Sequence, residues 1–227
     1  MRISDIKKEA RQSLAGYWAI GALLTFLVFL IDTVLPSILE IVTSGGLNQW
    51  LDDQTPLSVY YIEWIYSILL IPLYVAVLWF YLSLVRSKEP GIVHVFTIYN
   101  DWKLSLKMIR ASILMGIFVV LWSLLLVIPG VIKGFSYSQT LYILRDHPEY
   151  SVLEAITESR KLMNGYKAKY FLLNLSFIGW AILAAIPALI GYLWFVPYFI
   201  ASLSAFYNKL VEIPAGTQDT LNVPTTN

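Results

Sequence analysis

The sequence predicts an all-α, polytopic membrane protein with six transmembrane helices in three hairpins. Hydrophobic residues make up 58% of the chain and charged residues 14%, whereas about a quarter of the residues in a soluble domain are charged. Long uncharged stretches alternate with short basic segments, and several reach the ~20 residues that a helix needs to cross the hydrocarbon core. We expect each hairpin to follow an amphipathic helix that lies on the cytoplasmic surface.

The first unit begins with an amphipathic helix at the amino terminus. Ile6 and Ala10 belong to an apolar series with steps of three and four residues, and lysines lie on the other side. The uncharged run 14–31 is the predicted first span, and the uncharged run 64–85 is the second. We expect Pro72 to kink the second span because proline lacks the amide that a helix uses.

The second unit has the same plan. Residues 98–110 carry cations on one stripe and apolar residues on another, which predicts a surface helix. Residues 111–128 form the predicted third span, and Pro129 with Gly130 is expected to turn the chain at its end.

The return leg of this hairpin is short. Residues 131–145 would extend only ~22 Å at ~1.5 Å per residue, less than the ~30 Å hydrocarbon core. Two interpretations follow. Either Lys133 and Arg145 extend to opposite membrane surfaces, or the leg is re-entrant or thins the bilayer locally.

The third unit starts at a capping box. Ser151 and Glu154 have the spacing of this motif and predict a surface helix that Gly165 ends. The stretch 170–208 then holds 39 residues without a charge. This length suffices for two spans, with a hinge at 187–191.

The chain is expected to form one membrane domain, residues 1–211. Residues 212–227 are too few and too polar to build a core, so we predict a disordered cytoplasmic tail.

Charge predicts the orientation. In the six-span arrangement Lys133 is the only one of sixteen basic residues on the outer side, where five acids gather. The basic segments near span ends face the cytoplasm in membrane proteins. We therefore expect both termini in the cytoplasm.

A basic belt on the inner face is the first candidate site. Lysine or arginine near an anionic membrane surface contributes about 1 kcal/mol to binding, so these residues are candidates for contacts with lipid headgroups. The alternative is that they only set topology and anchor the helices. The candidates are Lys103, Lys107, Arg110, Arg160, Lys161 and Lys167.

Lys133 defines a second candidate, a polar outer cluster with Asp32 and Glu63. It could bind an anionic group, or it could form a structural ion pair that fixes the packing of two hairpins. Ser136, Ser138 and Asn174 are candidates for lining a polar cavity or permeation path. Small polar residues also let helices approach and hydrogen-bond one another, which is the alternative for this set.

Nothing in the sequence supports catalysis. The chain has no cysteine and two histidines, His94 and His147, and neither has a partner at the spacing of metal ligands or of a nucleophile and its base. No glycine-rich phosphate loop is present, and the basic patches adjoin spans. We predict a protein that is not an enzyme, with no cofactor, no metal and no nucleic-acid partner.

Several short motifs resemble those of a bacterial family of integral membrane proteins, catalogued as domain of unknown function 975. The motifs are Ile128-Pro129-Gly130, Lys133, Tyr137-Ser138, Tyr142, Asp146-His147-Pro148, Ala155, Ser159, Leu162-Met163, Gly165, Lys167, Leu175-Ser176-Phe177 with Trp180, Pro197-Tyr198 and Phe206-Tyr207. The resemblance implies a bacterial cytoplasmic membrane protein of unsettled activity. The chain is more distantly similar to the membrane region of some bacterial glycerophosphodiester phosphodiesterases, which would imply a six-helix domain beside phospholipid. No catalytic residue carries over.

Two functional hypotheses follow. The first is a non-enzymatic multi-span protein that binds membrane lipids or partner membrane proteins in envelope or membrane homeostasis. The alternative is a transporter or permease subunit for a small or amphipathic substrate. A water-filled cavity lined by Ser138 or Asn174 would favour transport, whereas an apolar core would favour binding.

Overall fold

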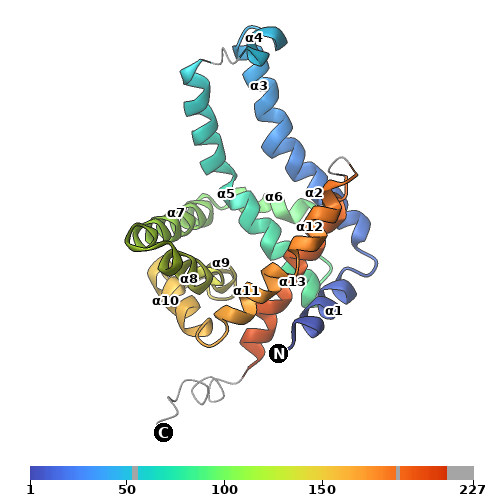
Figure 1. Cartoon of the computed structure of the whole chain (residues 1–227), viewed down its shortest axis with the longest axis vertical. Helices are drawn as coiled ribbons and strands as arrows, with labels where there is room; N and C mark the ends of the chain where they lie inside the picture. Colours follow the sequence, from blue (N-terminus) through green and yellow to red (C-terminus); the bar gives the residue numbers. More distant parts are fainter. Residues whose placement is uncertain (53–55, 188–189, 214–227) are drawn as a thin grey trace.

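The computed structural model describes residues 1–52, 56–187 and 190–213, and its regular structure in these ranges is entirely helical (Figure 1). Helix α1 (Ile3–Ser13) lies against helix α13 (Tyr192–Glu212) at one end of the molecule, which we call the base. The predicted tail lies outside the described residues from residue 214 onward, as does Asp53.

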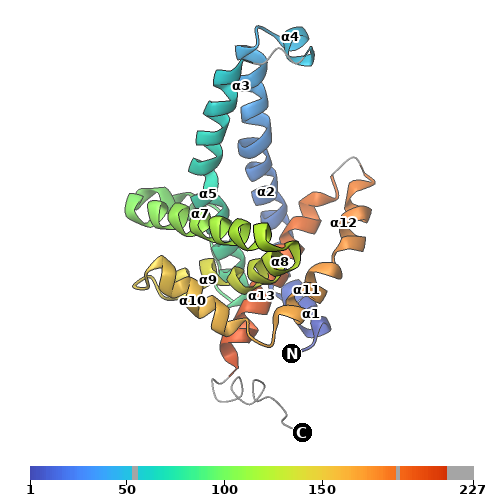
Figure 2. The same ribbon diagram turned by 60° about the vertical axis from the view of Figure 1, so that its left-hand side comes forward.

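A long two-helix hairpin projects from the base (Figures 1 and 2). Its first leg is α2 (Trp18–Phe29), which continues through a π-helical turn, η1 (Leu30–Val34), into α3 (Leu35–Thr43). The second leg is α5 (Leu57–Val85), with 29 residues. At ~1.5 Å per residue this leg is about 43 Å long, more than a ~30 Å hydrocarbon core requires.

The first leg is longer than predicted. We expected span one to end at residue 31, but Trp18–Thr43 is continuous over 26 residues. Asp32 is accommodated in the π-helical turn η1, and Pro36 follows it in α3. The short helix α4 (Leu47–Leu51) then forms the tip of the hairpin.

The core lies at the base, where α13 packs against α1, α2 and α5. Tyr81 and Leu82 of α5 and Ala201 and Ala205 of α13 are fully buried there. Gly21 lets α2 approach α13 closely, because a Cβ at this position would lie 3.1 Å from the Cβ of Pro197.

A helix is present where the third surface helix was predicted. Helix α10 (Val152–Leu162) begins at the expected capping box of Ser151 and Glu154. It is followed by α11 (Lys167–Leu175). The turn between them matches the turn between α1 and α2: each contains a glycine with positive φ, +75° at Gly165 and +83° at Gly16, followed by a tyrosine. The first and third units thus share a local structure.

The second unit differs from its prediction. The expected surface helix at 98–110 and span at 111–128 are one helix, α7 (Trp102–Leu125), preceded by the short α6 (Val93–Phe96) and the 3₁₀ turn η2 (Thr97–Asn100). The separation was wrong because the chain starts one helix at Asp101, whose side chain caps α7, and then has no breaking turn.

The return leg is broken into α8 (Val127–Tyr137) and α9 (Thr140–Asp146). The expected turn at Pro129 and Gly130 was also wrong, since the chain turns at Leu126 and Pro129 lies in the first turn of α8. Gly130 has a packing role instead: a Cβ there would lie 2.9 Å from the Cα of Ser123 on α7.

Four helical stretches of the described chain are long and apolar enough to cross a membrane. They are Trp18–Thr43, Leu57–Val85, Trp102–Leu125 and Lys167–Ala185, the last made of α11 and α12 (Ile178–Ala185). Their length and composition fit a membrane protein. Figure 2 shows α7 and α8 crossing the long hairpin, so the hairpins do not all run parallel.

Candidate functional site

An apolar cavity of about 890 Å³ lies between α2, α5 and α13. Phe26 and Phe29 line it and are 43% and 48% exposed, so the cavity opens at the surface of α2. Leu141 of α9 and Ser112 of α7 also take part in the lining. Its other apolar side chains include Leu24, Val28, Leu78, Leu193, Val196 and Ile200.

One polar group stands out in this lining. Asp32 is the only acidic residue among those that line the cavity, and its carboxylate accepts a hydrogen bond from the hydroxyl of Tyr74 on α5. Asp32 lies in the π-helical turn η1, and such turns occur frequently at functional sites. A carboxylate within a long apolar stretch costs free energy in a membrane, and such residues are therefore candidates for function.

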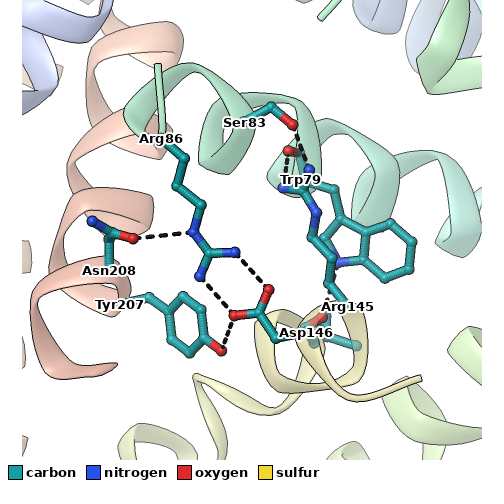
Figure 3. Close-up of polar contacts among 8 residues, drawn as sticks. Trp79, Ser83, Arg86, Arg145, Asp146, Tyr207 and Asn208 are labelled. Atoms are coloured by element: carbon teal, nitrogen blue, oxygen red, sulfur yellow. Dashed lines mark hydrogen bonds and ion pairs between the residues drawn. The ribbon is translucent and has the colours of Figure 1, made fainter. Parts of the chain in front are cut away.

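A polar junction joins α5, α9 and α13 at the base (Figure 3). Arg86 donates two hydrogen bonds of 2.6 Å to the two carboxylate oxygens of Asp146, and its Nε donates to the side-chain oxygen of Asn208 at 3.0 Å. The hydroxyl of Tyr207 donates to Asp146 at 2.8 Å. This bidentate geometry is the strong form of an arginine–carboxylate pair.

The junction stays charged at neutral pH. Burial by itself would raise the pKa of Asp146, but the hydrogen bonds from Arg86 and Tyr207 and the charge of Arg145 together hold it below its ordinary value. The hydrogen bond to Asp146 likewise raises the pKa of Arg86 against the effect of burial.

Arg145 lies beside this junction and points the other way, onto α5 (Figure 3). It donates to the main-chain oxygen of Trp79 and to the hydroxyl of Ser83. The indole of Trp79 in turn donates to the main-chain oxygen of Leu141 at 2.9 Å. Arg145 and Trp79 thus tie α9 to the last turns of α5 in both directions.

The predicted basic belt is distributed over α7, α10 and α11. Two of its members have specific partners. Lys107 donates to the main-chain oxygen of Pro148 at 2.6 Å, and Lys161 pairs with Glu158 at 3.1 Å. Lys103, Arg110 and Arg160 are exposed, and Lys167 is half-buried. The belt therefore combines exposed cations, of which Lys103 lies 6.0 Å from the ring centre of Trp102, with others that brace helices.

The structure does not bring Lys133 to Asp32 or Glu63. The Lys133 ammonium lies 4.3 Å from the ring centre of Trp122 and within electrostatic reach of Arg160 and Lys167. Asp32 pairs with Tyr74, and Glu63 lines a small cavity between α3 and α5. Lys133 therefore lies near the basic belt and not in the predicted outer cluster.

The three predicted cavity residues hydrogen-bond within their own helices. Ser136 and Ser138 donate to main-chain oxygens of α8 at 2.8 Å each, and Asn174 donates to that of Tyr170 at 2.7 Å. None of the three lines the large cavity. The hydroxyl of Ser159 on α10 donates to the main-chain oxygen of Ser136, so this region serves helix packing.

Sequence reasoning missed the junction and the Arg145 contacts. Arg145 was expected only to mark the end of the return leg, Asp146 was named only within a family motif, and Arg86 was assigned no role. The adjacent opposite charges at 145 and 146, after an apolar leg, were a usable signal.

In the described residues no group of three histidine, cysteine or acidic side chains is placed to hold a metal ion.

Comparisons with known proteins identify a family and no more. A family model described as "Protein of unknown function (DUF975)" matches residues 1–133 and 124–213. No curated protein and no solved structure matches the chain.

Proposed function

Because the chain belongs to the DUF975 family, whose description assigns no activity, we propose a function from the structure itself: a membrane protein that binds a lipid hydrocarbon chain between α2, α5 and α13. The observation that carries this proposal is the apolar cavity of about 890 Å³. Its volume lies within the ~300–1,000 Å³ range of small-molecule sites.

The membrane explains why such a cavity would hold lipid. Lipid tails are as apolar as leucine, so a chain gains little from the hydrophobic effect when it moves from the bilayer into the cavity. An empty cavity, however, loses the dispersion contacts of its lining. A side opening at Phe26 and Phe29 gives a neighbouring acyl chain access. Shape, and the polar pair of Asp32 and Tyr74 at the cavity, would then select the lipid.

Lipid binding is better supported than transport. The transport hypothesis depended on a polar cavity lined by Ser138 or Asn174, whereas the large cavity is apolar and neither residue lines it. Binding of partner membrane proteins and a role in membrane homeostasis remain part of the proposal, since the apolar outer faces of the hairpins could accept either lipid or protein.

We further propose the orientation that the charges favour, with both termini and the base on the cytoplasmic side of the bacterial membrane. The position of Lys133 near Arg160 and Lys167 supports this orientation. Lys133 was the one basic residue predicted on the outer side, and beside these two cations it would lie on the cytoplasmic side, as the positive-inside rule expects. Six crossings remain a prediction; α13 and the broken leg α8–α9 would have to supply two of them.

The chain has no cysteine, so single cysteines introduced for labelling report this orientation without background. In intact cells, Asn48→Cys at the tip should react with an impermeant maleimide, and Asn164→Cys at the base should react only after permeabilisation. Val127→Cys, between α7 and α8, tests the number of crossings: reaction in intact cells would support six spans, and reaction only after permeabilisation would place this turn, with Lys133, on the inner side. Labelling of position 164 in intact cells would contradict the orientation.

A filled cavity tests the lipid site. Leu78→Trp places a larger side chain into the cavity, and Leu69→Trp is the matched control, since Leu69 is on the same helix, is 55% exposed and does not line the cavity. Native mass spectrometry of protein released from detergent should find at least one fewer bound lipid on Leu78→Trp than on wild type or the control. Leu193→Trp, which fills the cavity from α13, serves if Leu78→Trp does not fold. Equal lipid retention by all variants would refute the proposal.

A further inference from the structure

A second, smaller cavity lies at the base against the last turns of α5. It has a volume of about 220 Å³, roughly seven times the ~30 Å³ that one water molecule occupies in the liquid. A larger share of its lining side chains is polar than in the large cavity. Among the residues that line it are Trp79, Ser83, His94, Thr97, Leu104 and Arg145.

Arg145 brings a charge into this cavity without a counter-ion of its own. In the described ranges its guanidinium donates to the Trp79 oxygen and the Ser83 hydroxyl, both neutral, and it takes part in no ion pair found there. Asp146 is close enough to act on it electrostatically. The two oxygens of Asp146, however, accept from Arg86 and Tyr207.

The surroundings therefore carry an excess of positive charge. Two guanidinium groups, Arg86 and Arg145, lie near one carboxylate, and burial together with the charge of Arg86 lowers the pKa of Arg145. A guanidinium has five N–H donors, of which the two bonds onto α5 use only part. A half-buried cation in this state favours an anion that can accept its remaining hydrogen bonds.

We propose that this cavity binds a phosphate group, with Arg145 as the residue that recognises it. Arginine matches the geometry of a phosphate with two parallel hydrogen bonds. The exposed His94 lies at the rim of the same cavity and adds a donor, while the hydroxyl of Thr97 beside it donates to the main-chain oxygen of His94 at 2.8 Å. Trp79 and Leu104 form an apolar wall of the cavity. The size of the cavity suits the phosphate of a monoester or diester.

The small cavity lies next to the large one, which suggests that the bound phosphate belongs to a phospholipid. This step rests on the proposed function. Leu141 lines the large cavity and Arg145 the small one, and these residues are four apart on α9, on one face of the helix. Trp79 bridges them through its hydrogen bond to Leu141. A phospholipid with its phosphate at Arg145 and one chain in the large cavity would occupy both.

Titration of the purified, delipidated full chain with three probes tests the site: phosphatidic acid, diacylglycerol, which has the same chains without phosphate, and inorganic phosphate as competitor. Arg145→Gln should weaken binding of phosphatidic acid at least tenfold and leave diacylglycerol binding unchanged. Arg11→Gln, an equal charge loss at an exposed position on α1, is the control and should stay within twofold of wild type.

A second variant guards against misfolding of Arg145→Gln. Thr97→Phe fills the small cavity from its exposed rim and leaves both bonds of Arg145 to α5 in place. It should reduce phosphatidic acid binding to a similar extent, with an unchanged unfolding midpoint.

The probes also distinguish the sources of the phosphate. If millimolar inorganic phosphate competes with phosphatidic acid on wild type but not on Arg145→Gln, the site exists and its ligand is free phosphate. If inorganic phosphate does not compete and Arg145→Gln still loses phosphatidic acid binding, the ligand is a lipid headgroup. Wild-type affinity for phosphatidic acid in Arg145→Gln and Thr97→Phe would overturn the proposal. Failure of the lipid-chain site appears separately, as diacylglycerol binding that Leu78→Trp does not change.

Discussion

Asp146 joins three helices through the two oxygens of one carboxylate. It accepts from Arg86 at the end of α5 and from Tyr207 on α13, and it is itself the last residue of α9. Arg86 and Asp146 are 26% and 19% exposed at their side chains. The pair is thus buried enough for its attraction to contribute to stability, while both ions keep some contact with solvent.

Asp146→Asn should lower the free energy of unfolding by about 1–3 kcal/mol, because Arg86 would lose its charged partner in a half-buried position. Chemical denaturation in detergent measures this. Glu149→Gln is the control: Glu149 is exposed and bonded only to His147 among side chains, so its loss should leave the midpoint unchanged. Equal effects of the two substitutions would show that the junction is not a stabilising pair.

The same pair predicts a pH dependence. The pKa of Asp146 is lower in the folded protein than its ordinary value of 3.8. Its contribution is therefore complete above the pKa of the unfolded chain and is lost as the pH falls through the folded pKa. We expect the stability difference between wild type and Asp146→Asn to be constant from neutral pH to about pH 5 and to shrink below pH 4. A difference that shrinks near pH 7 would contradict this assignment.

At the scale of elements, α7 and α8 depend on one close contact. A Cβ at Gly130 would lie 1.9 Å from the hydroxyl oxygen and 2.9 Å from the Cα of Ser123, and the backbone atom cannot move aside as a side chain can. Gly130→Ala should therefore separate the two helices and cost about 1–3 kcal/mol.

Gly116→Ala is the matched control for this contact, since a Cβ at Gly116 meets nothing within 4 Å. It lies in α7, where alanine is the better helix former by up to ~1 kcal/mol. Thermal unfolding of both variants in the same detergent should move in opposite directions. A stabilised Gly130→Ala would contradict the packing described for α7 and α8.

Elements with local signals were predicted well. The capping box at Ser151, the amino-terminal amphipathic helix and the apolar run of α5 are each specified by residues close together in sequence, and the structure contains all three. The prediction for residues 98–125 was wrong because amphipathic and apolar stretches give separate sequence patterns even when one continuous helix carries both. Nothing in the pattern indicates that a helix will continue past Arg110.

The site was predictable only in part. Asp32 was noticed as a charge, but its partner Tyr74 is 42 residues away in sequence and reaches it only because two legs of a hairpin lie side by side. Arg86 and Asp146 are separated by 60 residues. The pairing of Lys133 with Asp32 or Glu63 assumed that the hairpin of α7 and α8 runs alongside the first hairpin, whereas α7 and α8 cross it (Figure 2).

At the scale of the whole molecule, the charged junction of Arg86 and Asp146 joins helices at the base (Figure 3), and the apolar hairpin projects from the base (Figure 1). The two cavities lie on either side of this division: the large apolar one between the long helices and the small one beside Arg145. This arrangement resembles the lipid itself, a charged head and apolar chains. The lipid that we propose would lie with its phosphate at Arg145 and one chain between α2, α5 and α13.

An experimental structure of the protein in lipid nanodiscs tests the lipid site most directly. The account predicts elongated density between Leu78 of α5 and Leu193 of α13, in the cavity of about 890 Å³. A cavity closed by movement of α13 onto α5, or one filled by ordered water, would contradict it.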